Sequence, residues 1–244
     1  MIESLVTFAV LFDIDGTLVS SAVAENDERR RYSDAIRDIV GQTPEVAPGR
    51  FAGMVDPQIC QILLTELGLT NDKINHFVPQ VLSRMSDLYR RMHKTIALNS
   101  GVEELLPRLV ESPEHVVGVL TGNLEKIAKE KLASAEIISY FAEFYCADHY
   151  FDRTRLVADA VNSCVRKYQL PGSRNVMIVG DTPRDVEAAN VSEATSIGIA
   201  SSAFSMRQLS EAGAMQVYAN LKPTADFLAG LGLDPNKNSS KQSR

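Results

Sequence analysis

Cysteine is scarce in this sequence, and its spacing fits neither a metal site nor a set of disulfides. The 244 residues contain three cysteines, Cys60, Cys146 and Cys164, which are odd in number and far apart. No Cys-x-x-Cys pair occurs, which argues against a zinc site and against a disulfide framework. We expect the three thiols to be reduced and to contribute mainly to packing.

Long apolar runs and an excess of positive charge are also missing. No apolar stretch approaches the ~20 residues of a membrane-spanning helix, and the N-terminus lacks the basic and apolar segments of a secretory signal. A net charge of -6 provides no basic surface for nucleic acid, and we interpret the Arg29–Arg31 run, which follows Asp27 and Glu28, as a solvated helix start. The sequence therefore predicts a cytoplasmic protein that binds neither membranes nor nucleic acid.

The residues that are present suit a globular chain with a large core and a smaller second unit. From about Ser20 to Thr95, apolar residues recur at helical spacing. One stripe lies within 32–40, a second within 59–67 and a third within 74–92, where Pro79 must delay or kink the helix. These stripes contain no convincing strand and predict an all-helical insert.

Outside the insert, short apolar runs alternate with helical patterns. We expect strands at 8–12, 115–120, 143–147, 176–179 and 195–199, and helices at 101–110, 124–134, 153–168 and 184–190. This alternation predicts an α/β fold with a parallel sheet covered on both faces. Such a sheet binds ligands at the carboxyl ends of its strands.

The first expected strand ends at two acids one residue apart, Asp13 and Asp15, followed by Gly16. Two like charges held this close call for a cation, a shared proton, or both. A calcium-binding EF-hand loop starting at Asp13 would need glycine and glutamate where Leu18 and Ala24 stand, so that interpretation fails. Acids that only cap a turn remain an alternative for this stretch taken alone.

Two later strands also deliver polar residues at their ends. Thr121 and Gly122 precede an expected helix, an arrangement suited to holding phosphate oxygens, although Thr121 could simply cap that helix. Asp181 follows the strand at 176–179, and Asp185 comes four residues later. Carboxylates favour a hard cation such as Mg²⁺, and a helix-start role would also explain Asp185.

Taken in order, these stretches resemble a known family. Asp13-x-Asp15-Gly16-Thr17-Leu18, Thr121-Gly122-Asn123 and Gly180-Asp181-x-x-x-Asp185 look like the first, second and fourth motifs of the haloacid dehalogenase-like superfamily. The helical insert between the first two motifs is similar to that of its phosphoglycolate phosphatase-like subgroup. The resemblance implies a Rossmann-like core over 1–19 and 96–233, a helical cap over 20–95, and a polar tail over 234–244.

The same resemblance implies a Mg²⁺-dependent phosphatase that acts on a small phosphorylated metabolite through an aspartyl-phosphate. Asp13 would be the nucleophile and Asp15 the general acid and base. Thr121, with Gly122 and Asn123, would bind the phosphate. The metal would be held by Asp13, the backbone carbonyl of Asp15, and Asp181, with support from Asp185.

One role in the resemblance is filled less clearly. The family places a cation, usually lysine, between its second and fourth motifs, but residues 148–157 lack the usual Lys-Pro pair. Arg153 stands at about the expected distance before Asp181 and would act as a permanently charged, forked donor. Arg155 and Lys167 remain alternatives.

The cap would supply contacts to the rest of the substrate. Its irregular stretch at 48–53 offers a charge at Arg50 and an apolar surface at Phe51, so both are candidate substrate-binding residues, although this stretch could be only a connecting loop. We expect hinges near 19–22 and 97–100, because a mobile cover can exclude water during phosphoryl transfer.

Three other functions are compatible with parts of this pattern. A phosphomutase of the same superfamily would share Asp13 and Asp15. The presence of Thr17 after Gly16 slightly favours the hydrolases. A haloalkanoate dehalogenase is disfavoured because those relatives lack the second acid. A non-catalytic phosphate-binding or signalling module is disfavoured by the full set of catalytic side chains. The sequence identifies neither the substrate nor a choice between monomer and dimer.

Overall fold

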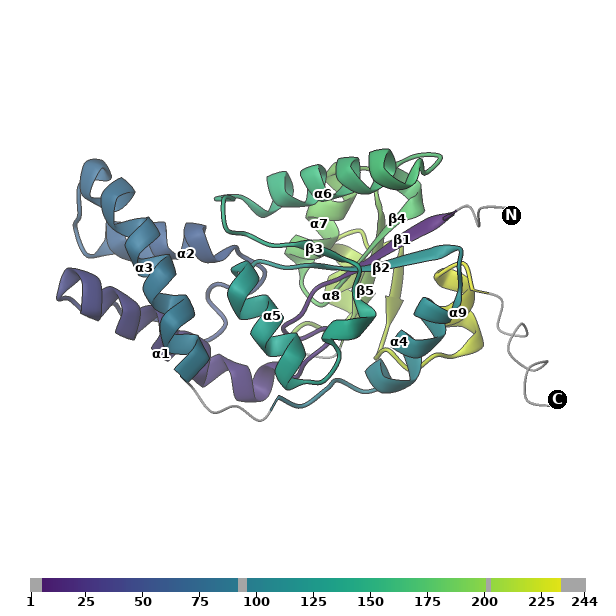
Figure 1. Cartoon of the computed structure of the whole chain (residues 1–244), viewed down its shortest axis with the longest axis horizontal. Coiled ribbons are helices and arrows are strands. Elements are labelled where there is room, and N and C mark those ends of the chain that lie inside the picture. The colour runs from purple at the N-terminus through teal and green to yellow at the C-terminus, as the bar shows by residue number, and fades with distance from the viewer. Residues whose placement is uncertain (1–5, 92–95, 201–202, 234–244) are drawn as a thin grey trace.

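The computed structural model describes residues 6–91, 96–200 and 203–233, without the side chains of 21–29. A sheet with helices on both sides forms one end of the molecule, and a group of three helices forms the other (Figure 1). The predicted polar tail at 234–244 lies outside the described residues. None of the described helices is both long enough and apolar enough to cross a membrane.

Six parallel strands form the sheet, in the order β3-β2-β1-β4-β5-β6. Their bounds are β1 Phe8–Phe12, β2 His115–Leu120, β3 Glu143–Tyr145, β4 Val176–Gly180, β5 Thr195–Ile199 and β6 Gln216–Tyr218. The central strands β1, β2 and β4 are nearly continuous apolar runs because both of their faces are covered. The five predicted strands are confirmed, and the sixth is a three-residue edge strand too short to show a period.

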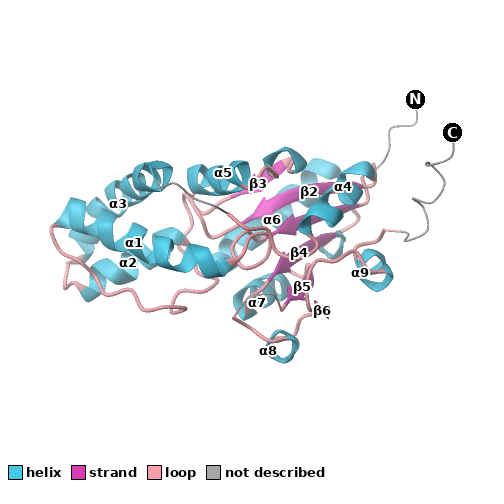
Figure 2. Ribbon diagram, turned by 90° about the horizontal axis from the view of Figure 1, so that it is seen from below, coloured by secondary structure: helices cyan, strands magenta, loops and turns pink. Residues whose placement is uncertain are grey.

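Alternate residues of β1 enter two separate apolar cores. Val10 and Phe12 pack with α4 (Val102–Glu111), α5 (Glu125–Ser134) and α9 (Ala225–Gly230) on one face. Ala9 and Leu11 pack with α6 (Arg153–Tyr168) and α7 (Pro183–Val191) on the other face (Figure 2). The predicted α/β fold with a doubly covered parallel sheet is thus confirmed, while α9 and the short α8 (Met206–Glu211) are additions to it.

The described part of the insert contains helices and loops but no strand, as predicted. It consists of α1 (Ser21–Val40), α2 (Asp56–Glu66) and α3 (Asn71–Arg91), joined by loops. The three helices share an apolar core of their own, which extends onto Leu124 and Ile127 at the start of α5. The helix α1 begins well before its apolar stripe. The helix α3 continues through Pro79, which excludes a delayed start and leaves the kink as the remaining alternative.

The two connections to the insert lie side by side. Val19 on the outgoing connection forms an antiparallel bridge with Leu98 on the returning one. The Asn99 side chain donates hydrogen bonds to the backbone carbonyls of Gly16, 2.8 Å away, and Thr17, 2.9 Å away. The predicted hinges therefore fall on paired segments that are tied to the turn after Asp13, and hinge motion itself stays a prediction.

Candidate active site

The carboxyl ends of β1 and β4 bring the first and fourth motifs together. The two strands are hydrogen-bonded neighbours, and the Asp13 N–H donates to the Val179 carbonyl at 2.9 Å. Asp13 and Asp181 thus stand next to each other at the ends of adjacent strands. The turn that follows Asp15 packs closely against Asp181 because it contains Gly16. This residue has a φ of 82°, and a Cβ on it would lie 2.2 Å from a carboxylate oxygen of Asp181.

Three carboxylates form a compact cluster at this edge. Oxygens of Asp13, Asp181 and Asp185 all lie within 4.8 Å of one another. One oxygen of Asp185 accepts hydrogen bonds from the Thr182 N–H and hydroxyl in a capping box, which fixes the carboxylate at the start of α7. An all-oxygen set of buried carboxylates has the donor chemistry that suits Mg²⁺, so the residues present fit such an ion.

Arg153, the first residue of α6, enters this cluster. Its guanidinium lies 3.2 Å from Asp13 and also contacts Asp185, and the side chain is 6% exposed. Within the described structure, its Nε is a buried donor without a hydrogen-bond partner. The alternatives lie elsewhere: Arg155 pairs with Asp159 and Lys167 with Glu143, both on exposed surface. The geometry thus brings Arg153, and neither alternative, to Asp13.

Burial raises the pKa of Asp13 well above its usual value, and the neighbouring Asp185, Asp181 and Asp15 raise it further. Arg153 opposes this effect with its positive charge. The site therefore concentrates more negative charge than one arginine offsets. A divalent cation at the cluster would favour the ionised form of Asp13.

The end of β2 presents the second motif from the other side of β1. The Thr121 hydroxyl is fully buried and accepts a hydrogen bond from the Asn123 side-chain amide at 2.9 Å. A Cβ on Gly122 would lie 2.2 Å from the carbonyl oxygen of Met54, so glycine lets the insert approach this strand end closely. Thr121 caps no helix, since α5 begins only at Glu125 with Leu124 at its N-cap.

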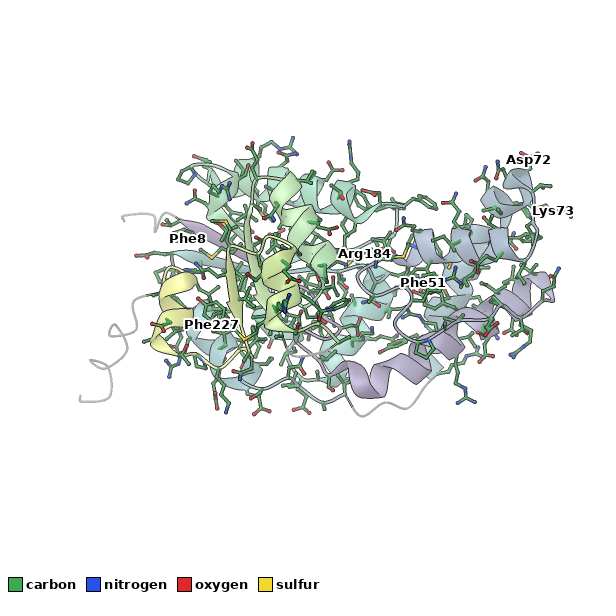
Figure 3. All side chains as sticks on the ribbon, turned by 180° about the vertical axis from the view of Figure 1, so that it is seen from behind. Phe8, Phe51, Asp72, Lys73, Arg184 and Phe227 are labelled. Carbon is green, nitrogen blue, oxygen red and sulfur yellow. The ribbon has the colours of Figure 1, made fainter. Side chains whose placement is uncertain are left out.

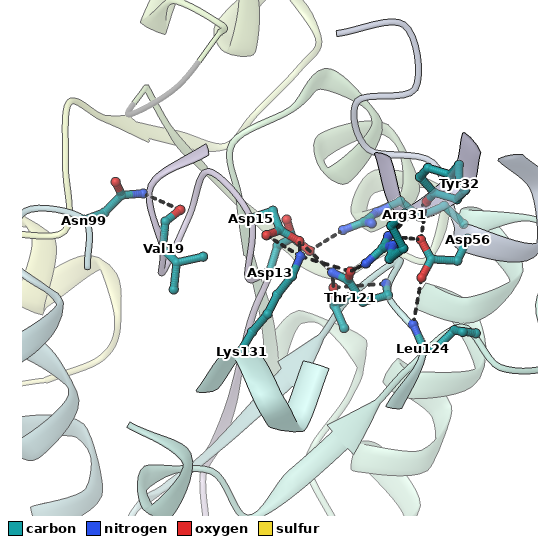
Figure 4. Close-up of polar contacts among 12 residues, drawn as sticks. Asp13, Asp15, Val19, Arg31, Tyr32, Asp56, Asn99, Thr121, Leu124 and Lys131 are labelled. Atoms are coloured by element: carbon teal, nitrogen blue, oxygen red, sulfur yellow. Dashed lines mark hydrogen bonds and ion pairs between the residues drawn. The ribbon is translucent and has the colours of Figure 1, made fainter. Parts of the chain in front are cut away.

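A buried lysine that the sequence analysis did not single out holds Asp15. Lys131 of α5 is 2% exposed, and its Nζ lies 2.6 Å from one carboxylate oxygen of Asp15 and 3.1 Å from the Asn123 side-chain oxygen (Figure 4). Asn123 donates to the other oxygen of Asp15 at 2.6 Å. Burial alone would raise the pKa of Asp15, but Lys131 and the hydrogen bonds lower it overall. A signal was available, because Lys131 follows the buried Ile127 by one helical turn.

Replacement of Lys131 by methionine should misplace Asp15. The variant leaves the carboxylate without its buried cation, so we expect turnover to fall by roughly 10- to 100-fold and the free energy of unfolding to fall by about 3 kcal/mol. Lys129→Met on the same helix removes an exposed pair with Glu125 and a contact with the Phe144 ring, and should stay within about 1 kcal/mol of the wild type. Steady-state kinetics and urea denaturation of both variants measure the effect, and equal behaviour of the two would contradict it.

A second buried pair joins the insert to the core. Arg31 of α1 is 1% exposed and lies 3.0 Å from Asp56 at the start of α2. The other oxygen of Asp56 accepts from the Leu124 N–H at 3.0 Å, across the junction with the core (Figure 4). The prediction that the Arg29–Arg31 run is solvated is therefore wrong for Arg31, because this residue lies one turn before Ala35 on the buried face of α1; the Arg29 side chain lies outside the described residues.

A cavity of about 200 Å³ lies between the insert and the strand ends. Its walls include predicted site residues from the core, namely Asp13, Asp15, Thr121, Gly122, Asn123, Arg153 and Asp181. From the insert, Phe51 reaches the cavity near the junction, where Arg184 of the core donates to the Ala52 carbonyl (Figure 3). Arg50 does not line the cavity: its guanidinium pairs with Glu66 on the exposed side of the insert.

Comparisons with known proteins agree with this architecture. The family model for haloacid dehalogenase-like hydrolases matches residues 10–199. A search of curated proteins found no significant match.

Several solved structures share the fold over most of their length. A hydrolase from Pseudomonas syringae is 21% identical with a TM-score of 0.67, and the match covers 92% of this chain and 99% of that one. A predicted phosphoglycolate phosphatase from Haemophilus somnus is 16% identical with a TM-score of 0.64, over 94% and 99% of the two chains. A β-phosphoglucomutase from Clostridium difficile is 14% identical with a TM-score of 0.67, over 92% and 96%. At these identities the likeness concerns the fold.

Proposed function

Because the chain belongs to the haloacid dehalogenase-like hydrolases, we propose that it is a Mg²⁺-dependent phosphatase that hydrolyses a small phosphate monoester through an aspartyl-phosphate. One observation carries the proposal: Asp13, Asp181, Asp185 and Arg153 converge at adjacent strand ends beneath a small cavity. The match to the family model for haloacid dehalogenase-like hydrolases supports a hydrolytic reaction. Phosphoryl transfer needs mainly positioning and charge stabilisation, which such a cluster supplies.

In the first step, a carboxylate oxygen of Asp13 attacks phosphorus, the bond from phosphorus to the alcohol oxygen breaks, and Asp15 gives a proton to that oxygen. In the second step, Asp15 takes a proton from water as the water oxygen attacks phosphorus. The bond between phosphorus and the Asp13 oxygen breaks, so that phosphate leaves and the Asp13 carboxylate is restored. Contact with Lys131 favours the ionised form of Asp15, so the geometry supports its role as base more directly than its role as acid.

The remaining residues would hold the transferring group. Arg153 offers its buried Nε and forked guanidinium to phosphoryl oxygens, and Asp185 orients this arginine. Thr121 offers its hydroxyl from the end of β2. These donors would stabilise the negative charge that spreads over the phosphoryl oxygens in the transition state.

Magnesium would be held by the carboxylates of Asp13 and Asp181 and by the backbone carbonyl of Asp15, with Asp185 supporting from the edge of the cluster. When bound, the ion supplies positive charge that offsets these carboxylates and the phosphate. Thr17 steadies one of these ligands, since its hydroxyl lies 3.2 Å from an Asp181 oxygen.

Hydrolysis of 4-nitrophenyl phosphate tests the proposal. We expect turnover with Mg²⁺, loss of it on chelation, and recovery when Mg²⁺ is returned, because the acidic cluster then regains its counter-charge. The proposal would be contradicted if none of a few dozen phosphorylated metabolites released phosphate at any Mg²⁺ concentration. A phosphomutase would instead return an isomeric phosphate ester, so quantifying free phosphate against isomer separates the two activities.

A further inference from the structure

The cavity has two unlike sides. Its acidic floor is lined by Asp13, Asp15, Asp181 and Arg153, and Asp185 completes the carboxylate cluster next to them. Phosphate and metal would occupy this side. Its opposite side, here called the roof, comes from the insert and is mainly apolar. The apolar residues are Val46, Ala47, Phe51, Ala52, Met54 and Ile59, and the polar ones are Arg31, Tyr32 and Asp56. The part of a substrate beyond its phosphate would therefore meet apolar surface.

The one described cation on the insert side of the cavity is already neutralised. Arg31 lies against Asp56, and both are at least 96% buried. Both oxygens of Asp56 are engaged, one by Arg31 and the Tyr32 hydroxyl and the other by the Leu124 N–H. The pair thus brings no net charge to the cavity.

Among the described residues that line the cavity, the cations are Arg31 and Arg153, and each already lies against a carboxylate. Lys131 offsets Asp15, and Arg153 faces the three carboxylates of the floor. One divalent cation would balance the excess on the floor, and the phosphate dianion then makes the filled site negative again. A further carboxylate or phosphate on the substrate would meet net repulsion close to these buried charges, where screening by solvent is weaker than in bulk water.

On the premise of the proposed phosphatase function, we propose that the substrate is a small phosphate monoester whose alcohol carries no second acidic group and turns an apolar face to Phe51 and Ile59. The volume of about 200 Å³ supports the size limit, since it lies below the roughly 300–1,000 Å³ of pockets for drug-sized ligands. The neutral Arg31–Asp56 pair and the apolar roof support the charge limit.

Two isosteric esters test the charge limit on the wild-type chain. 4-Carbamoylphenyl phosphate and 4-carboxyphenyl phosphate have nearly the same shape but differ by one negative charge. We expect kcat/KM to be at least about tenfold higher for the carbamoyl ester, because like charges in one site repel. Equal values, or a preference for the carboxylate, would overturn the inference.

The Asp56→Asn variant tests the reason for the preference. It leaves the Arg31 charge uncancelled, so the ratio of the two kcat/KM values should fall toward one or invert. Asp38→Asn makes the same substitution on the exposed side of the insert, where Asp38 pairs with Arg84, and should keep the wild-type ratio. If Asp56→Asn does not fold, the wild-type comparison still decides the question.

The Phe51→Ala variant tests the apolar contact. Loss of the ring should raise the KM for phenyl phosphate by roughly tenfold and leave the KM for methyl phosphate nearly unchanged. The proposed substrate class alone is overturned if the protein hydrolyses phenyl phosphate but prefers the carboxylate ester. It is also overturned if Phe51→Ala leaves the KM for phenyl phosphate unchanged. A chain that hydrolyses none of these esters overturns the proposed function, and the substrate class with it.

Discussion

Asp13→Asn should abolish turnover, with a loss on the order of 10⁴- to 10⁶-fold in kcat, as for other covalent nucleophiles. The amide keeps the shape of the side chain but cannot form the acyl phosphate. Asp15→Asn should lose roughly 10²–10⁴-fold, the usual contribution of general acid–base catalysis. The two variants also differ after acid quench: mass spectrometry should find a phosphorylated chain in Asp15→Asn and none in Asp13→Asn.

The Asp13→Asn substitution should also stabilise the metal-free protein at neutral pH. A carboxyl group whose pKa is raised on folding holds its proton more tightly in the folded state, so wild-type stability falls as pH rises from the usual Asp value toward the raised one. Asp13→Asn lacks this loss, and its Tm should exceed that of the wild type in chelator. Substantial turnover in purified Asp13→Asn protein would refute the mechanism, and a lower Tm would refute the electrostatic interpretation.

Arg153→Ala should also strongly reduce activity. It leaves Asp13 and the buried Asp185 without their shared cation, and it removes the donors aimed at the phosphoryl group, so we expect a loss of about 10²–10³-fold in kcat/KM. Arg153→Lys should recover part of this loss, because the charge returns without the fork. Inhibition by inorganic phosphate should weaken in parallel, which a general loss of stability would not produce.

Arg155→Ala and Lys167→Ala are the matched controls. Both residues are more than half exposed and make surface ion pairs, which contribute about 1 kcal/mol or less. Each variant should therefore retain activity close to that of the wild type. If either variant were crippled while Arg153→Ala remained active, the cationic role would move to that residue.

The fold and the floor of the site could be predicted from local patterns. Strands β1 and β4 are apolar runs that end at acids, and their parallel pairing follows from the alternation with helices. The resemblance to the superfamily implied a cation between the second and fourth motifs, and the position of Arg153 before Asp181 favoured this residue. Each of these features lies within a short window of sequence.

The residues that were missed depend on contacts between distant segments. Lys131 meets an acid 116 positions away, and Arg31 meets an acid 25 positions away. Basic residues on helices are usually solvated, so only their place on an apolar helix face distinguishes these two. Elements α8, α9 and β6 were missed for another reason, because they are too short for a period to be recognised.

The antiparallel bridge between Val19 and Leu98 has a consequence for how this architecture can change. The insert leaves the core and returns to it at nearly one point. For the core, the helices of the insert are therefore equivalent to a loop whose two ends coincide. The closure entropy of such a loop depends only weakly on the length of the loop. Evolution, or a protein engineer, can therefore exchange the whole helical unit, and the substrate contacts with it, while Asp13, Asp181 and Arg153 keep their places on the sheet.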